Sequence, residues 1–241
     1  MPKPRNSIEF KVWGRYALFT DPLTKVGGEK CSYHVPTYEA LKGVVKSIYW
    51  KPTLIWIIDE VRVMKRIRTQ TKGTKPQEFS GGNTLAIYTF LADVEYQVRA
   101  HFEWNEHRAA LSVDRVEGKH YAIARRMLER GGRQDIFLGT RDCQAYVEPC
   151  EFGSGTGALD GASELAFGLM FHGFDYPDET GDDKLHARFH PTTMIDGVVR
   201  FERPENCRHR KFVRAMTVKP FGAGQNLLPV EEEAAALGVL E

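Results

Sequence analysis

The sequence predicts an α+β protein whose N-terminal part follows the order strand, helix, strand, strand, helix, strand. Apolar and polar residues alternate over residues 8–14 and 94–104, as they do in half-buried strands. Apolar residues recur at helical spacing over residues 37–50 and 121–130, and the β-branched run at residues 53–58 is typical of a central strand. This order is that of the ferredoxin-like (RRM-like) βαββαβ arrangement, which hosts many functions and by itself assigns none.

Turn and breaker residues limit the first elements. Gly14 ends the first strand, and Asp-Pro and Gly-Gly pairs mark a long loop after it. Thr37 is placed to cap the following helix. That helix must end near Trp50, because Pro52 disfavours helical geometry in the residue before it. Tyr49 is therefore expected at the C-terminal edge of this helix.

The middle of the chain supplies the rest of the predicted βαββαβ unit. Residues 69–82 are rich in Lys, Thr and Gly and are expected to form a mobile loop. The helix at residues 121–130 is stopped by the glycine pair at 131–132. Short strands are predicted at residues 136–138 and 145–147.

A change of composition at residues 153–157, which read Gly-Ser-Gly-Thr-Gly, predicts a linker. It does not predict a phosphate-binding loop, because no strand followed by a GK[ST] pattern surrounds it. Beyond it, short β-like pieces are separated by Gly, Pro and Asp turns. We therefore expect a ferredoxin-like domain at residues 1–152, a small antiparallel β-sheet domain at residues 158–222 and a tail at residues 223–241.

Composition and charge exclude several classes of protein. The net charge of the 241 residues is +1, so any nucleic-acid binding must come from local patches. No apolar run approaches the roughly 18 residues of a membrane span, and the N-terminus lacks the apolar core of a signal peptide. The four cysteines show no C-x-x-C pairing. We expect a cytoplasmic protein with reduced thiols and no membrane partner.

The eight histidines do not predict a metal site. His186 and His190 are four residues apart, but the residues between them are typical of a strand, where this spacing does not bring two rings to one ion. The chain contains no H-E-x-x-H motif and no recognisable Ser or Cys nucleophile motif. We expect no metal and no cofactor.

The run Glu117-Gly-Lys-His-Tyr is the first candidate site. Lys119 and His120 would lie at a helix N-terminus, where unpaired N–H groups and the helix dipole favour a phosphate. The competing interpretation is a solvated helix start. Tyr49 is a candidate neighbour, because antiparallel helices on one face of a sheet place opposite ends together. Packing at a helix end is the alternative role for this tyrosine.

Basic residues are concentrated in the N-terminal half, where they could form a groove for a phosphate backbone. Each one alone is better explained as a solvated surface charge, and only their concentration in this half indicates a groove. The candidate residues for such a groove are Lys46, Lys51, Arg62, Lys65, Arg66, Arg68, Arg125, Arg126 and Arg133.

Several blocks between Tyr16 and Gly181 resemble one known family. They are residues 16–25, 27–30, 35–43, 47–52, 82–86, 117–121, 135–139, 146–155 and 172–181. The chain is similar across these blocks to the fifth Cas protein family in its type I-C (Dvulg) form, a RAMP-type family of CRISPR-associated pre-crRNA endoribonucleases. The resemblance implies a ferredoxin-like N-terminal domain and a small β-rich C-terminal domain. The region after Glu205 resembles the family less clearly.

The resemblance also implies an activity and partners. The family's enzymes cut the CRISPR repeat hairpin in precursor RNA without a metal, keep the crRNA bound and join the other subunits of the interference complex. The family's catalytic tyrosine, lysine and histidine fall on Tyr49, Lys119 and His120. A non-cleaving subunit that grips the crRNA end is the leading alternative, and binding of duplex DNA is a further one.

Metal-free cleavage uses the RNA's own 2′-hydroxyl, which attacks phosphorus and leaves 2′,3′-cyclic phosphate and 5′-hydroxyl ends. The enzyme must align this attack, move protons and stabilise charge. We therefore expect Lys119 to stabilise charge and His120 to transfer a proton. Tyr49 would orient the 2′-hydroxyl or assist its deprotonation. Tyrosine is a poor base unless its neighbours lower its pKa.

Overall fold

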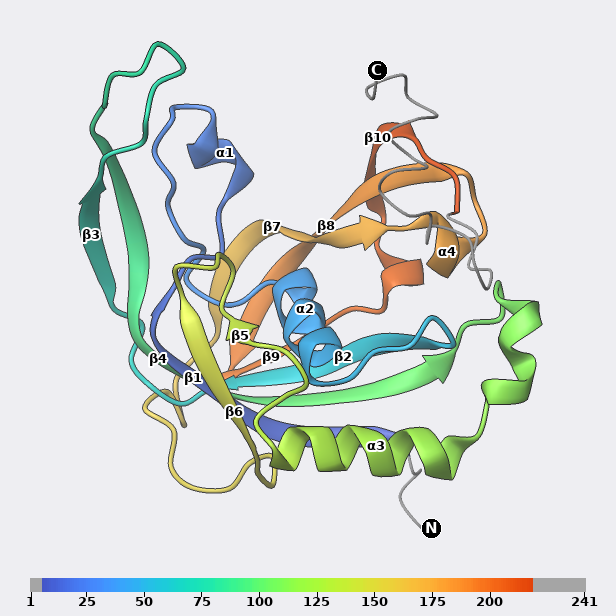
Figure 1. Ribbon diagram of the computed structural model, residues 1–241. Coiled ribbons are helices and arrows are strands. Elements are labelled where there is room, and N and C mark those ends of the chain that lie inside the picture. Colours follow the sequence, from blue (N-terminus) through green and yellow to red (C-terminus); the bar gives the residue numbers. More distant parts are fainter. Residues whose placement is uncertain (1–5, 219–241) are drawn as a thin grey trace, which may run out of the picture.

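An antiparallel sheet dominates this mixed helix-and-strand protein. The computed structural model describes residues 6–218, and Figure 1 shows them. The strands of the sheet follow the order β10-β8-β9-β2-β4-β1-β6-β5, with β3 paired to β4 and β7 paired to β8. The principal elements of the first half are β1 (Ser7–Ala17), α2 (Tyr38–Ile48), β2 (Leu54–Val63), β4 (Ala86–Trp104), α3 (Glu117–Glu129), β5 (Ile136–Phe137) and β6 (Gln144–Pro149).

The α2 helix forms where the sequence predicts it. The Thr37 side chain accepts a hydrogen bond from the Ala40 amide at 3.2 Å and so caps the first turn. Leu41, Val45 and Ile48 are on the buried stripe. The helix lies between β2 and β7 and contacts both (Figure 1). Tyr49 follows it in extended geometry, so its side chain leaves the helical stripe and points toward α3.

The prediction for α3 is wrong at its start. The helix begins at Glu117 rather than Tyr121, and no side chain caps it. Lys119 and His120 therefore lie within its first turn, and the His120 amide donates to the Val116 carbonyl at 3.2 Å. Gly118, a poor helix former, obscures this start in the sequence. The buried stripe of α3 consists of His120, Ala124 and Leu128, at four-residue spacing.

The prediction of a loop at residues 69–82 is also wrong in part. Thr69–Thr74 form β3, which pairs with the first half of β4 in the register Thr69↔Leu91 to Thr74↔Ala86. β4 thus begins at residue 86 instead of 94. Both faces of β3 are largely exposed, so the alternation that marks a half-buried strand is absent from it. The paired strands extend away from the centre of the molecule (Figure 1).

The C-terminal strands extend the same sheet. They are β7 (Leu165–Asp175), β8 (Lys184–Ile195), β9 (Val198–Arg200) and β10 (His209–Ala215), and the short α4 (Pro177–Thr180) connects β7 to β8. β9 joins the two halves, because it pairs with β2 from Glu60↔Arg200 to Arg62↔Val198. The predicted tail at residues 223–241 lies outside the described residues, as does the end of the predicted domain at 158–222.

Three further observations concern membrane-spanning helices, disulfides and metal sites. Every helix within residues 6–218 is too short or too polar to cross a membrane. The four cysteines are free thiols. In the same part of the chain, no three His, Cys, Asp or Glu side chains gather in a way that would hold a metal ion.

Candidate active site

Tyr49 and His120 meet where the end of α2 approaches the start of α3. The Tyr49 hydroxyl lies 2.8 Å from His120 Nδ1, and the two ring centroids are 6.0 Å apart. Both side chains are buried, with exposed fractions of 3% for Tyr49 and 0% for His120. The two helix ends that the sequence suggests as neighbours are therefore in direct contact.

The partners of His120 define its neutral tautomer. Its Nε2 lies 2.6 Å from the main-chain carbonyl oxygen of Asp114, which can only accept a hydrogen bond. Nε2 must therefore carry the proton, and in the neutral ring Nδ1 accepts a hydrogen bond from the Tyr49 hydroxyl. Trp104 and Phe102 pack edge-on against the imidazole, at centroid distances of 5.6 and 6.4 Å. These contacts leave the ring little freedom to rotate.

Asp114 connects this pair to Lys119. Its Oδ1 lies 2.5 Å from Lys119 Nζ, and its Oδ2 accepts a hydrogen bond from the Thr53 hydroxyl at 2.9 Å. Oδ2 is also 3.5 Å from His120 Nε2. One carboxylate therefore contacts a lysine, a threonine and a histidine, and it covers the polar atoms through which His120 and Lys119 would act.

Electrostatics in this cluster constrain the role of Tyr49. The hydrogen bond from Lys119, followed by that from Thr53, holds the pKa of the Asp114 carboxyl below its usual range. Burial raises the pKa of Tyr49, and the nearby Asp114 charge raises it further, while Arg133 opposes both. Tyr49 therefore stays protonated near neutral pH and acts here as a hydrogen-bond donor.

An open cavity of about 340 Å³ lies beside the His120 ring. Phe102 and Trp104, which pack on that ring, form part of its lining together with Asn6, Glu103 and Glu117. Phe102 is only 2% exposed, so the partly buried Trp104 is the aromatic side chain on which a nucleobase could stack. The cavity therefore provides space for a nucleotide next to the histidine.

The candidate RNA-binding residues divide into three groups. Arg62 is buried, and its guanidinium binds Asp160, Gln97 and the carbonyls of Ser154 and Gly155. Four are ion-paired, namely Lys46 with Glu179, Lys65 and Arg68 with Asp93, and Arg125 with Glu129. The remaining residues, Lys51, Arg66, Arg126 and Arg133, are exposed. Arg133 acts electrostatically on Tyr49 and so lies near the candidate site, whereas Arg62 has a structural position.

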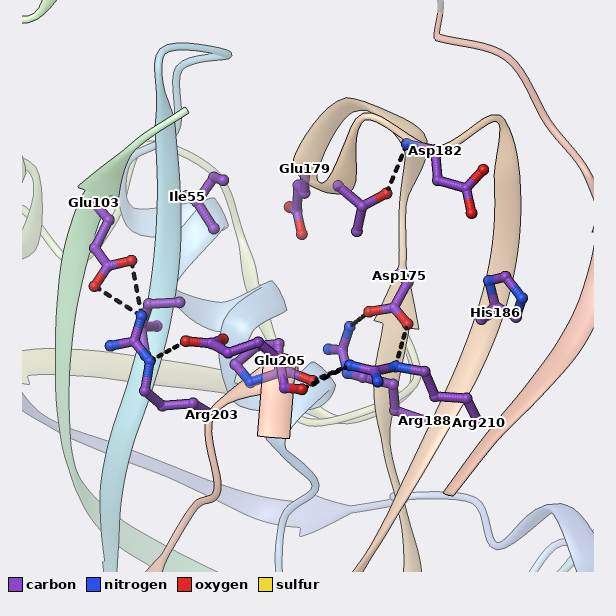
Figure 2. Close-up of a pocket in the computed structure, with 13 residues that line it drawn as sticks. Ile55, Glu103, Asp175, Glu179, Asp182, His186, Arg188, Arg203, Glu205 and Arg210 are labelled. Carbon is purple, nitrogen blue, oxygen red and sulfur yellow. Dashed lines mark hydrogen bonds and ion pairs between the residues drawn. The ribbon is translucent and has the colours of Figure 1, made fainter. Parts of the chain in front are cut away.

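A larger pocket of about 540 Å³ lies between β2 and the C-terminal strands (Figure 2). Its arginines are already bound to carboxylates. Arg203 forms a two-oxygen contact with Glu103 at 2.9 and 3.0 Å, while Arg188 and Arg210 both bind Asp175. These guanidinium charges are neutralised within the protein, as is the charge of Lys119 by Asp114, so what distinguishes the Lys119 cluster from this pocket is the Tyr49–His120 pair.

Asp114 and Thr53 are members of the cluster that the sequence does not reveal. Asp114 ends the short 3₁₀ helix η1 (Ala109–Asp114) in a stretch that the sequence predicts only as a charged loop, and Thr53 begins a predicted strand. Neither belongs to a motif. Only the tertiary contact between the starts of β2 and α3 brings them together.

The fold and this cluster define a class, an α+β protein with buried acid–base groups beside a lysine and next to a cavity with aromatic walls. The sequence model of the Cas5d family, described as CRISPR-associated protein (Cas_Cas5), matches residues 7–202. The chain belongs to this family.

Individual relatives agree with the family assignment. A protein of Mannheimia succiniciproducens named CRISPR pre-crRNA endoribonuclease Cas5d is 30% identical over 58% of this chain and 71% of its own length. A protein of Thermus thermophilus with the same name is 28% identical over 74% of this chain and 77% of its own. A solved structure described as a CRISPR-associated protein superposes with a TM-score of 0.71, at 35% identity over 85% of this chain and 96% of that one.

Proposed function

We propose that this protein is a metal-independent endoribonuclease that cleaves CRISPR repeat precursor RNA to mature crRNA. We further propose that it stays bound as a subunit of the type I-C interference complex. The observation that carries the proposal is the hydrogen-bonded Tyr49–His120 pair next to Lys119. The names of the relatives supply the substrate class.

The proposed reaction is attack by the 2′-oxygen on the adjacent phosphorus. The bond to the 5′-oxygen breaks as the 2′-oxygen bond forms, and the 2′-hydroxyl proton passes to solvent. His120 in its imidazolium form donates the Nε2 proton to the departing 5′-oxygen, while the Tyr49 oxygen accepts a hydrogen bond from Nδ1–H. Lys119 stabilises charge on the nonbridging oxygens. The products are a 2′,3′-cyclic phosphate and a 5′-hydroxyl.

Tyr49 is proposed to orient the reacting groups rather than to act as a base. Burial and Asp114 raise its pKa, which opposes ionisation of its hydroxyl. Its hydroxyl instead fixes the imidazole and, in the proposed reaction, donates to the 2′-oxygen once RNA is bound. A preorganised donor of this kind loses little freedom at the moment of reaction.

The proposed RNA surface reaches from this cluster to the opposite end of β2, where Lys65, Arg66 and Arg68 follow the strand. It includes Lys51 and the exposed arginines 66, 126 and 133, together with the ion-paired Lys46, Lys65, Arg68 and Arg125, which would exchange a carboxylate for a phosphate. Arg62 is left out, because its donors are used inside the protein. We also propose that the first half is a ferredoxin-like domain, which the strand order β2-β4-β1-β6 supports.

A non-cleaving crRNA-end binding subunit is the second candidate function. It is favoured by the 0% exposure of His120 and by the contacts of Asp114 with both polar groups that the reaction needs. A protein that kept this arrangement on RNA would bind without cutting.

Cleavage of a CRISPR repeat hairpin in EDTA tests the proposal. We expect cutting to persist, with cyclic phosphate ends, and to stop when the nucleotide at the cut carries a 2′-deoxy sugar that leaves binding nearly intact. Binding without cleavage would identify the non-cleaving subunit, and cutting of the deoxy substrate would exclude 2′-hydroxyl attack. Equal affinity for unrelated duplex DNA, with a steep salt dependence, would point to DNA binding instead.

A further inference from the structure

The surroundings of the Asp114 carboxylate are those of a bound anion. Lys119 Nζ lies 2.5 Å from one oxygen, the Thr53 hydroxyl 2.9 Å from the other, and His120 Nε2 3.5 Å from the latter. A phosphodiester resembles a carboxylate here, because both carry one negative charge shared by two terminal oxygens and accept hydrogen bonds from the same donors.

We propose that Asp114 occupies the position of the scissile phosphate in the free protein, and that Thr53 is a further residue that contacts this phosphate. RNA binds by displacing Asp114 from the three donors. The inference rests on the proposed function, since it identifies where the cleaved linkage lies. It adds a positioning residue and an internal competitor for the substrate.

The three donors belong to firmly held elements. Thr53 is 1% exposed, and its carbonyl accepts a hydrogen bond from the Asn105 amide at 2.9 Å, next to the start of β2. Lys119 and His120 are in the first turn of α3, which the buried residue Ala124 anchors to the core. The backbone that carries these donors therefore keeps its arrangement whether or not Asp114 is present, and the half-exposed Lys119 side chain can follow an anion that replaces the carboxylate.

Asp114 itself belongs to a loosely held segment. No residue of η1 is buried, and the preceding residue Val113 is 91% exposed. Segments with few buried contacts open at low free-energy cost. Arg115, which follows Asp114, is anchored by Glu106 at 2.6 Å and by the Asn105 carbonyl at 3.0 Å. The segment can therefore swing outward about Arg115 while the core stays intact.

Displacement of Asp114 also exposes the proton-transfer atom. The Asp114 carbonyl holds His120 Nε2 at 2.6 Å, and the carboxylate holds Lys119. A single movement therefore frees both groups that the proposed reaction needs. Only molecules in which Asp114 has left the donors can bind RNA. The apparent affinity is therefore the intrinsic affinity multiplied by the fraction of such molecules.

Binding of repeat RNA with a 2′-deoxy sugar at the cut site tests this inference without depending on cleavage. Asp114→Asn keeps the size of the side chain but removes the competing charge, so we expect binding about 5- to 20-fold tighter than wild type. Asp142→Asn, at an exposed position in the turn before β6, is the matched control and should change nothing. Unchanged or weaker binding by Asp114→Asn, with an unchanged melting temperature, would overturn the proposal.

Thr53→Val tests whether Thr53 contacts the phosphate, because the two possible roles of Thr53 change RNA affinity in opposite directions. If Thr53 contacts the phosphate, the variant binds the RNA several-fold more weakly, both alone and combined with Asp114→Asn. If Thr53 only holds Asp114 in place, its loss frees the donors and tightens binding. Tighter binding would therefore remove Thr53 from the site.

Hydrogen exchange on the wild-type protein gives a readout that needs no variant. RNA binding should speed amide exchange in residues 109–116 while slowing it in the first turn of α3. Slower exchange in residues 109–116 would contradict displacement of Asp114. If wild type does not cut repeat RNA but Asp114→Asn binds it more tightly, the proposed cleavage fails and the phosphate position stands. If wild type cuts but Asp114→Asn binds no more tightly, the phosphate position fails and the proposed cleavage stands.

Discussion

The Tyr49 hydroxyl and His120 Nδ1 lie 2.8 Å apart although 71 positions separate the two residues in the sequence. The contact depends on two local features. α2 stops at Ile48, so that Tyr49 turns away from the helical stripe, and α3 starts early enough to place His120 on its buried face. The tyrosine and the Asp114 carbonyl together leave no polar atom of the imidazole unpaired.

Replacement of Tyr49 by Phe should slow cleavage while keeping the fold. The ring stays, but Nδ1 of buried His120 loses its partner, which costs about 1–3 kcal/mol of stability. We expect a single-turnover cleavage rate about 10- to 100-fold lower. Tyr121→Phe, at a half-buried position in α3, is the control for loss of a hydroxyl. A wild-type rate in Tyr49→Phe would remove Tyr49 from the reaction.

Replacement of Lys119 by Ala should lower the cleavage rate about 100- to 1000-fold, because the developing charge loses its cation. The lysine is half-exposed, so its ion pair with Asp114 adds little to stability and the melting temperature should barely change. Lys119→Arg should restore part of the rate. Lys184→Ala, at the exposed start of β8 and outside the cluster, should cut normally, and a similar loss in both alanine variants would argue against a specific role.

Arg62 and Arg66 should separate stability from RNA binding. Arg62→Ala leaves Gln97 and the carbonyls of Ser154 and Gly155 without their donor, which costs about 1–3 kcal/mol in urea unfolding. The folded fraction should bind RNA as wild type does. The exposed Arg66→Ala should leave stability within about 0.5 kcal/mol but weaken binding and reduce its salt dependence. The reverse pattern would return Arg62 to the RNA surface.

His172 should make the protein less stable in acid. Burial, with the Arg188 charge beside it, lowers the pKa of His172 to about 3. Its Nε2 donates to the Glu202 carbonyl, and its Nδ1 accepts from Arg188. Between about pH 6.5 and pH 3 the unfolded chain binds the extra proton, so stability falls as pH falls through that range.

The His172→Gln variant measures how much His172 contributes to the pH dependence of the unfolding free energy. Between pH 7 and pH 5, wild type should lose about 2 kcal/mol more unfolding free energy than His172→Gln. The exposed His209→Gln should follow wild type. Equal losses in all three proteins would show that His172 is protonated in the folded state.

The sequence predicts the elements whose signals are local. Thr37 caps α2 as expected, because capping depends on neighbouring residues alone. The predicted start of α3 is wrong because Gly118 interrupts the helical propensity, and β3 escapes prediction because neither of its faces is buried. The strand β10 escapes it too, and all seven of its residues are exposed. Periodicity detects a strand only where one side is covered.

In the candidate site, too, some features can be predicted from the sequence and others depend on tertiary packing. The βαββαβ order predicts that the end of one helix approaches the start of the other, and this makes Tyr49 a candidate neighbour of His120. The burial of Arg62 and the position of Asp114 depend on which loops fold over the sheet, namely residues 153–157 for the first and η1 for the second. A basic residue on a strand has the same sequence signature whether solvent or another loop lies above it.

The pairing of β9 with β2 has a consequence for the solution behaviour of the protein. Without β9, the outer edge of β2 around Val61 would present unpaired amides and carbonyls, and such an edge is a template for intermolecular strand addition. Hydrogen bonds from Val63 to Gly197 and from Phe201 to Asp59 close the edge on either side. β9, a strand of only three residues, thus prevents β2, which begins beside Thr53, from pairing with a strand of another molecule.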